Sequence, residues 1–230
     1  MQGEKRGLGE QVMSGAAWVG AGRLGVRLIS IVSTLILVRL LAPEDFGLVA
    51  VAMAFVGVLS QMSDFGFNAA LIRFQDATRE DYATAWTLNV ARSVLVSGLL
   101  FALSGPIAAF YGDQRLEALI AVVAVIPLVS GFTNVRLIDF EKGMDFRPLS
   151  ALMVVVKLVA FATTITVALL TRSYWALIAG TIVAQVVRLG LTYWLVPFRP
   201  WPTLASWRRL LGFSGWLLGA NFLQALNMRA

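Results

Sequence analysis

The chain has 230 residues and a net charge of +6; 58% of its residues are hydrophobic and only 14% are charged. Soluble proteins are about 45–50% hydrophobic and about 25% charged, so this composition nearly excludes a soluble domain and predicts an integral membrane protein. The sequence contains no Cys and no His, which excludes disulfides, thiol catalysis, haem ligation, and zinc or copper sites built on those ligands.

Several apolar stretches approach the roughly 20 residues that cross about 30 Å of hydrocarbon as a helix. In chain order they are residues 17–41, 47–66, 85–109, 116–136, 149–171 and 174–196. Their continuous apolar runs lack the alternation of barrel strands, and only helices or closed barrels satisfy the backbone within lipid. We therefore expect an all-α, polytopic helical membrane protein with a six-helix N-terminal lobe.

The expected domain organisation has four parts. They are a cytoplasmic N-terminal segment (1–16), a six-helix transmembrane lobe (17–196), a cytoplasmic Pro- and Arg-rich linker (197–209) and the start of a truncated seventh helix (210–230). The letters FSGW near the beginning of the last part echo MSGA before the first helix, as expected if a second copy of the unit begins there. We expect this chain to be the front half of a larger transporter or a truncated copy of one.

Orientation follows from the basic residues of the connections. Ten Lys or Arg residues lie in segments 1–16, 67–84, 136–148 and 197–212, against two, Arg115 and Arg172, in the alternate connections. Cytoplasmic loops carry the excess of positive charge. The sequence predicts a multi-pass protein of a cytoplasmic membrane with its N-terminus in the cytoplasm.

Charged residues inside the expected spans are the candidate functional groups. Five basic residues are the candidates: Arg23, Arg27, Arg92, Lys157 and Arg188. The acidic candidate that accompanies them is Asp64, near the end of the second span. If all five cations faced lipid at mid-depth, the cost would be on the order of 12–17 kcal/mol. We therefore expect most of them to face away from lipid.

Helical spacing groups these residues with polar neighbours. The groups are Arg23 with Arg27, Asn89 with Arg92, Gln185 with Arg188, and Asp64 with Asn68. Residues three or four apart share one face of a helix. Polar faces on several helices predict a shared, water-filled cavity, and five cations against one carboxylate predict an anionic ligand.

A structural role for the same charges is the alternative. Lys157 and Arg188 lie within reach of a span end, where long side chains extend to the headgroups. Arg92 and Asp64 are candidates for a simple ion pair. A first span that begins later than residue 17 would place Arg23 and Arg27 at the cytoplasmic interface.

Five strings of the sequence, in order, carry a family resemblance. They are LAPEDFG at 41–47, DFGFNAALI at 64–72, TAWTLN at 84–89, PIAAFYGD at 106–113 and MDFR at 144–147. Together they resemble the polysaccharide transporter (Wzx-type oligosaccharide flippase) family of the multidrug/oligosaccharidyl-lipid/polysaccharide superfamily. The resemblance runs from about residue 10 to the end.

The resemblance implies two six-helix lobes that move an undecaprenyl-pyrophosphate oligosaccharide across the bacterial inner membrane by alternating access, for lipopolysaccharide, O-antigen or exopolysaccharide biosynthesis. This chain supplies only the first lobe. Arg23, Arg27 and Arg92 are the leading expected contacts to pyrophosphate, and Lys157 and Arg188 are secondary. Asn68, Asn89 and Gln185 are expected to hydrogen-bond the sugar. Expected partners are the lipid-linked substrate, membrane lipids and possible polymerase or transferase proteins.

Three other functions compete with this interpretation. A drug/cation antiporter of the same superfamily would need buried carboxylates, and only Asp64 qualifies. A membrane-embedded glycosyltransferase often holds a metal with a paired acidic motif, which is absent apart from Asp139 and Glu141 in a short basic loop. A non-transporting scaffold of a polysaccharide assembly complex is the third. We expect no enzyme activity, catalytic residue, cofactor or metal, and no nucleic-acid binding, because the positive charge sets topology or lies within spans.

Overall fold

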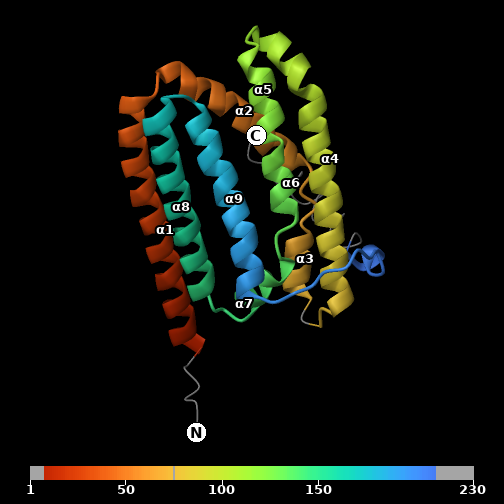
Figure 1. The fold of residues 1–230 in the computed structure, drawn as a ribbon. Helices are drawn as coiled ribbons and strands as arrows, with labels where there is room; N and C mark the ends of the chain where they lie inside the picture. Colours follow the sequence, from red (N-terminus) through yellow and green to blue (C-terminus); the bar gives the residue numbers. More distant parts are fainter. Residues whose placement is uncertain (1–7, 75, 211–230) are drawn as a thin grey trace, which may run out of the picture. The chain divides into compact units, whose positions relative to one another are not determined.

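The computed structural model describes residues 8–74 and 76–210, and in these ranges every regular element is helical. In chain order they are α1 (Leu8–Leu40), α2 (Pro43–Met62), α3 (Phe67–Arg73), α4 (Arg79–Tyr111), α5 (Arg115–Val123), α6 (Val125–Gly131), the short 3-10 helix η1 (Val135–Leu137), α7 (Ile138–Lys142), α8 (Arg147–Thr171) and α9 (Trp175–Leu195) (Figure 1). The all-α, polytopic membrane fold expected from the sequence is confirmed. The expected seventh helix lies outside the described residues.

Five helices of the described chain are long and apolar enough to cross a membrane. They are Ala17–Leu40 of α1, together with α2, α4, α8 and α9. These five correspond to expected spans one, two, three, five and six. Apart from the helix ends and the position of Pro106 in α4, an α-helix pairs its main-chain groups internally, which is the condition for crossing hydrocarbon.

The remaining expected span, residues 116–136, is interrupted. Pro127 has no N–H to bond the carbonyl of Val123, and its ring crowds that carbonyl; α5 ends at Val123 and α6 begins at Val125. A second break follows Gly131, and the segment Val135–Lys142 is bent by 59° from Arg115–Gly131. Residues 8–74 and 76–210 contain a sixth span only if this bent pair crosses the membrane as one.

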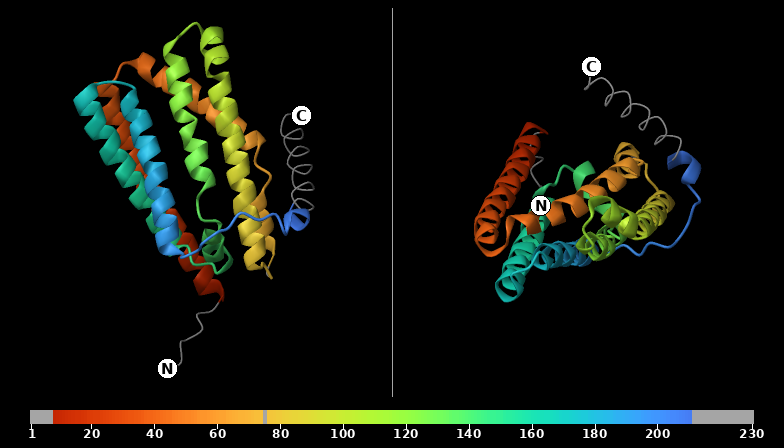
Figure 2. Two further views of the ribbon diagram at one scale, coloured as in Figure 1. Left: turned by 45° about the vertical axis from the view of Figure 1, so that its right-hand side comes forward. Right: turned by 90° about the horizontal axis from the view of Figure 1, so that it is seen from above.

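The chain divides into two compact units, and each is described by itself. Unit 1 comprises Met1–Gly47 and Asp139–Leu195, and unit 2 comprises Leu48–Ile138 and Val196–Ala230. In unit 1, α8 lies beside both α1 and α9 (Figures 1 and 2). A buried cluster of Leu37, Leu41, Ala168 and Ala176 joins the three helices at one end.

Gly180 allows α9 to approach α8 closely. A Cβ at this position would overlap Oγ1 of Thr164 and would lie 3.0 Å from the carbonyl oxygen of Ala160. Small residues at helix contacts allow backbones to approach in membrane proteins, where van der Waals packing supplies much of the attraction. This contact fixes the rotation of α9 against α8, and with it the side of α9 that carries Gln185 and Arg188.

In unit 2, α4 is the central helix. It packs along α5 and α6, and its beginning contacts α3 and η1 (Figure 2). The core at that end is formed by Phe67, Ala70, Leu71, Tyr82, Ala85, Val135, Ile138, Phe198 and Leu210. Phe198 and Leu210 come from the segment after α9, so this segment is part of unit 2 and completes its core.

Candidate functional site

Arg23 and Arg27 lie on one side of α1, and both are exposed. Gly22 is buried against α8, where an added Cβ would lie 3.1 Å from Cβ of Ser150. Successive residues of a helix are rotated by about 100°. Arg23 and Arg27 therefore point away from α8, and they share the face predicted from their spacing.

Lys157 lies on the side of α8 that faces α1 and α9. It is seven residues from both Ser150, which faces α1, and Thr164, which faces α9. Residues seven apart lie on nearly the same side of a helix. Lys157 is half-buried, whereas the other predicted cations of unit 1, Arg23, Arg27 and Arg188, are exposed.

Gln185 and Arg188 lie on α9, and they differ in environment. Arg188 is exposed and Gln185 is half-buried. The side-chain oxygen Oε1 of Gln185 is buried and accepts no hydrogen bond from any described residue. Because buried amide oxygens in native proteins nearly always accept a hydrogen bond, this atom is available to a donor that the described chain does not supply.

In unit 2, Arg92 and Asp64 form an ion pair. The distance from Arg92 Nη1 to Asp64 Oδ1 is 3.6 Å, and their side chains are 23% and 66% exposed. The Nε atom of Arg92 is buried without a hydrogen-bond partner in the described chain. Arg92 therefore retains donor capacity toward an anion beyond its contact with Asp64.

The position of Asp64 corrects the expected second span. We placed Asp64 inside residues 47–66, but α2 ends at Met62. Oδ1 of Asp64 accepts a hydrogen bond from the backbone N–H of Gly66 at 3.0 Å, and Gly66 has a left-handed φ of 65°. A side chain that bonds the backbone two residues later forms a turn that competes with the helix. Asp64 thus lies in the α2–α3 connection.

The packing of α6 determines which side of α4 carries Arg92. Gly131 meets α4 so closely that an added Cβ would overlap Oγ of Ser93 and would lie 3.1 Å from the carbonyl oxygen of Asn89. Ser93 is buried, while Asn89 is half-buried. The predicted group of Asn89 and Arg92 therefore borders the contact with α6. Asn68, on α3, is exposed.

The nine predicted ligand-contacting residues fall in both units. Unit 1 holds Arg23, Arg27, Lys157, Gln185 and Arg188, and unit 2 holds Asp64, Asn68, Asn89 and Arg92. The four predicted cations of unit 1, Arg23, Arg27, Lys157 and Arg188, have no carboxylate oxygen within 4.0 Å among the described side chains, in contrast to Arg92. A cavity shared by all nine residues stays a prediction.

Unit 2 contains a hollow of about 570 Å³ between α4 and α5. Its lining residues are Phe101, Ser104, Gln114, Glu117, Ala118 and Ala121. None of the predicted site residues is among them. Among the described residues there is also no group of three or more carboxylates placed to hold a metal ion.

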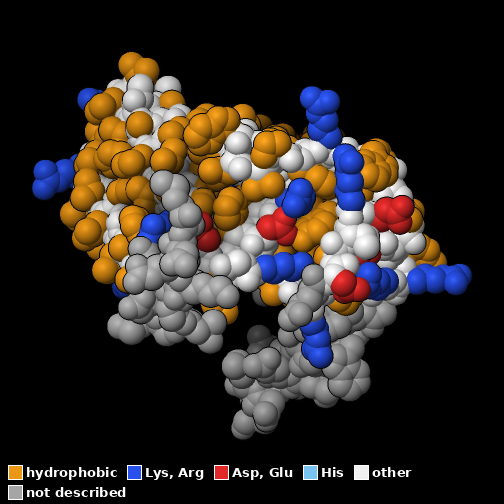
Figure 3. Space-filling view, turned by 90° about the horizontal axis from the view of Figure 1, so that it is seen from below, with side chains coloured by type: hydrophobic (Ala, Val, Ile, Leu, Met, Phe, Trp, Pro, Cys, Tyr) orange, Lys and Arg blue, Asp and Glu red, His pale blue; other side chains and the backbone are white. Residues whose placement is uncertain are grey.

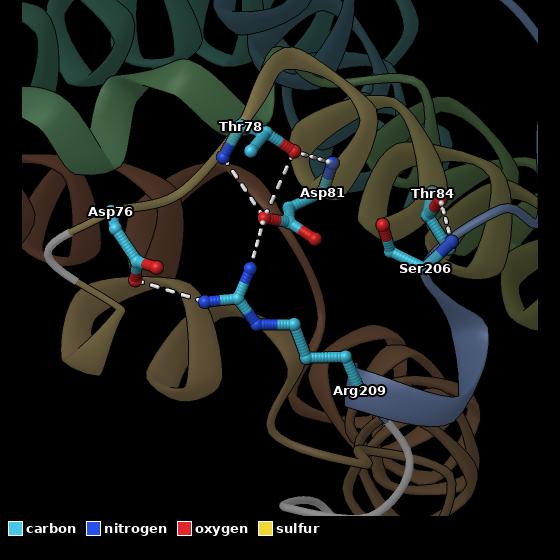
Figure 4. Close-up of polar contacts among 6 residues, drawn as sticks. All are labelled: Asp76, Thr78, Asp81, Thr84, Ser206 and Arg209. Carbon is cyan, nitrogen blue, oxygen red and sulfur yellow. Dashed lines mark hydrogen bonds and ion pairs between the residues drawn. The ribbon is translucent and has the colours of Figure 1, made fainter.

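Sequence reasoning missed a polar network of unit 2 that joins the segment after α9 to the beginning of α4 (Figure 4). Arg209 Nη1 donates to Oδ2 of the buried Asp81 at 3.1 Å, and Nη2 donates to Oδ1 of Asp76 at 2.9 Å. Thr78 and Asp81 form a capping box, in which Asp81 Oδ2 also accepts from the Thr78 backbone at 2.9 Å. The Thr-x-x-Asp spacing was a readable signal for this cap.

A family profile described as polysaccharide biosynthesis protein matches residues 36–230. The chain is 27% identical over 84% of its length to the teichuronic acid biosynthesis protein TuaB of Bacillus subtilis (strain 168). It is 27% identical over 92% to the succinoglycan biosynthesis transport protein ExoT of Rhizobium meliloti (strain 1021), and 24% over 96% to the lipopolysaccharide biosynthesis protein WzxC of Escherichia coli (strain K12). It spans 40%, 44% and 46% of these relatives, respectively. No solved structure matches the chain.

Proposed function

The chain belongs to the family of polysaccharide biosynthesis proteins, and from this premise we propose that it is the first helical lobe of a flippase for an anionic lipid-linked oligosaccharide. The cargo is of the undecaprenyl-pyrophosphate type. The fold of a multi-pass membrane protein supports this proposal, and so does the name of the Rhizobium relative, a succinoglycan biosynthesis transport protein. Transport moves the cargo without changing it covalently, so the proposal includes no catalytic residue.

The charge inside the spans is the observation that carries the proposal. Arg23, Arg27, Arg92, Lys157 and Arg188 all lie within helices that are long enough to cross a membrane. In those five helices the acidic residues lie only in the first turns of α2 and α4. Intramembrane charge of one sign favours a ligand of the other sign, and a pyrophosphate is the part of the cargo that most needs compensation in hydrocarbon. The same asymmetry argues against a cation antiporter.

Guanidinium groups suit this cargo because they bind phosphate oxygens through two parallel hydrogen bonds. We assign the leading pyrophosphate contacts to Arg23, Arg27 and Arg92, of which Arg92 has an Nε donor without a partner in the described chain. Lys157 and Arg188 are secondary contacts. Asn68, Asn89 and Gln185 supply hydrogen bonds to the sugar, and Asp64 holds Arg92 until the cargo arrives.

The whole protein is proposed to work by alternating access of two lobes about the bound cargo. The share of its relatives that the chain spans, less than half, fits one lobe of such a pair. The proposed orientation has the N-terminus in the cytoplasm, and the excess of Lys and Arg in the connections supports it. A polymerase or transferase of polysaccharide assembly is the expected protein partner.

Complementation of surface-polysaccharide export tests the assignment in cells that lack the native protein. The protein that carries this chain is tested with Arg23, Arg27 and Arg92 changed together to Gln, and separately to Lys. The Gln variant is expected to reduce export at least about tenfold, because it removes the charge that each proposed phosphate contact needs. The Lys variant keeps the charge and loses the paired geometry, so partial export is expected.

Arg39 provides the matched control. It lies in the last turn of the same helix as Arg23 and Arg27, and it is exposed. Arg39→Gln is expected to leave export unchanged at an equal membrane level of protein. Full export by the triple Gln variant would refute the assignment of the three arginines.

A further inference from the structure

The segment of residues 196–210, here called the strap, is held to unit 2 along one side. The backbone N–H of Thr203 donates to Thr87 Oγ1 at 3.1 Å, and that of Ser206 donates to Thr84 Oγ1 at 3.3 Å. Phe198 and Leu210 are buried in the core. With Arg209 bound to Asp81, these contacts fix which side of the strap faces α4 (Figure 4).

The other side of the strap presents aromatic and aliphatic side chains. Trp201, Leu204 and Trp207 are 40%, 54% and 43% exposed. They recur every third residue, between the buried Phe198 and Leu210. Burying such side chains in an apolar phase is favourable by about 1.5–3 kcal/mol each for complete burial. Their exposure therefore marks a contact surface rather than a part of the core.

Arginine side chains accompany these tryptophans. The guanidinium of Arg79 lies 4.5 Å from the centre of the Trp201 ring, and that of Arg208 lies 5.4 Å from the Trp207 ring. Arg199 is also exposed. Arg, Asp and Glu side chains gather at this end of unit 2, as the right-hand part of Figure 3 shows. Two of the three carboxylates in residues 73–84, those of Asp76 and Asp81, are already bound by Arg209.

The length of α4 places the strap near the membrane surface. Its 33 residues extend about 50 Å at 1.5 Å per residue, which exceeds the roughly 30 Å of hydrocarbon by several residues at each end. The strap binds α4 through Asp81, Thr84 and Thr87, all within its first nine residues. This is the depth at which Trp side chains and lipid phosphates are found.

We propose that the strap is an in-plane membrane anchor whose arginine–tryptophan pairs bind the phosphates of anionic phospholipid headgroups. Trp201, Leu204 and Trp207 enter the boundary between headgroups and acyl chains, and Arg79, Arg199 and Arg208 contact the phosphates. This arrangement combines apolar burial with attraction to anionic lipid. The proposal does not depend on the transported cargo.

A fluorophore on the strap tests the proposal, because the native sequence has no Cys. The full chain carrying Leu204→Cys is labelled with an environment-sensitive dye and reconstituted into phosphatidylcholine vesicles with increasing phosphatidylglycerol. We expect the dye emission to shift to the blue as phosphatidylglycerol increases. We also expect stronger quenching by a spin label near the headgroup than by one deep in the acyl chain. Inorganic phosphate in neutral vesicles is expected to cause no shift, which separates lipid headgroups from free phosphate.

The charge dependence is tested with Arg199→Gln and Arg208→Gln together in the same labelled chain. Each arginine near an anionic surface contributes about a fivefold preference, so the double variant should need several-fold more phosphatidylglycerol for the same shift. Arg172→Gln, in the α8–α9 connection, is the matched control and should behave as the labelled parent. Two results would overturn the proposal. One is dye emission that the spin labels do not quench and that does not depend on lipid composition, as expected for a strap covered by protein. The other is a double variant that keeps the helical content of the parent and needs no more phosphatidylglycerol than the parent does.

Discussion

Removal of Arg209 is expected to loosen the strap, and the neighbouring Arg208 provides a matched control. Arg209 makes two ion-pair contacts, one to the buried Asp81 and one to Asp76, whose side chain is 80% exposed. An exposed ion pair contributes roughly 0.2–1 kcal/mol. A hydrogen bond to a charged, buried group contributes about 1.5–3 kcal/mol, which is discounted here because the Arg209 side chain is 41% exposed.

Arg209→Ala is therefore expected to weaken the docking of the strap on α4 by about 2 kcal/mol. This corresponds to an increase on the order of 30-fold in the equilibrium constant for release of the strap from α4. The assay is amide hydrogen exchange in detergent without anionic lipid, followed at Thr203 and Ser206, whose N–H groups are protected by α4. Both amides should exchange up to about 30-fold faster in Arg209→Ala. Arg208→Ala should leave them unchanged. Equal exchange in the two variants would refute the reasoning that the Arg209 contacts hold the strap.

Two further predictions concern the helices that carry the candidate site. Gly180→Ala should destabilise unit 1 by about 1–3 kcal/mol, because the added Cβ would overlap Thr164. The measurement is thermal unfolding in detergent, with Gly190→Ala as the control because the space around Gly190 is open. Equal unfolding midpoints for the two variants would contradict the packing argument. Arg92→Gln should change the free energy of unfolding by less than about 1 kcal/mol, since its partner Asp64 is exposed. The same variant should lower export. A large loss of stability with normal export would contradict the assignment of Arg92 as a pyrophosphate contact.

The membrane-spanning helices were predictable because length and hydropathy decide them locally. Five of the six expected spans are continuous helices. The fourth expected span, residues 116–136, is interrupted for a local reason too, because Pro127 breaks the helix at Ala124 within an otherwise apolar stretch. Hydropathy also extended the second span through Asp64, where a side-chain turn at Gly66 ends the helix. Turn chemistry, rather than hydrophobicity, therefore set the boundaries that were misplaced.

The candidate site was predictable as a set of residue types but not as a geometry. Helical spacing correctly placed Arg23 with Arg27 on one face of α1, and the Arg92–Asp64 contact was anticipated as an alternative. The contacts of Arg209 join residues that are 128 and 133 positions apart. No local pattern specifies such a pairing, since it depends on how the strap returns to α4.

The most direct test of the central claim is a transbilayer-movement assay on the purified protein that carries this chain. Vesicles receive a fluorescent prenyl-pyrophosphate oligosaccharide or the same oligosaccharide on an uncharged prenyl lipid, and the fraction reachable by a membrane-impermeant quencher is followed over time. We expect rapid movement of the pyrophosphate lipid only, and at least about tenfold slower movement after Arg23, Arg27 and Arg92 are changed together to Gln. Equal movement of charged and uncharged lipids, or parental movement by the triple variant, would contradict the account.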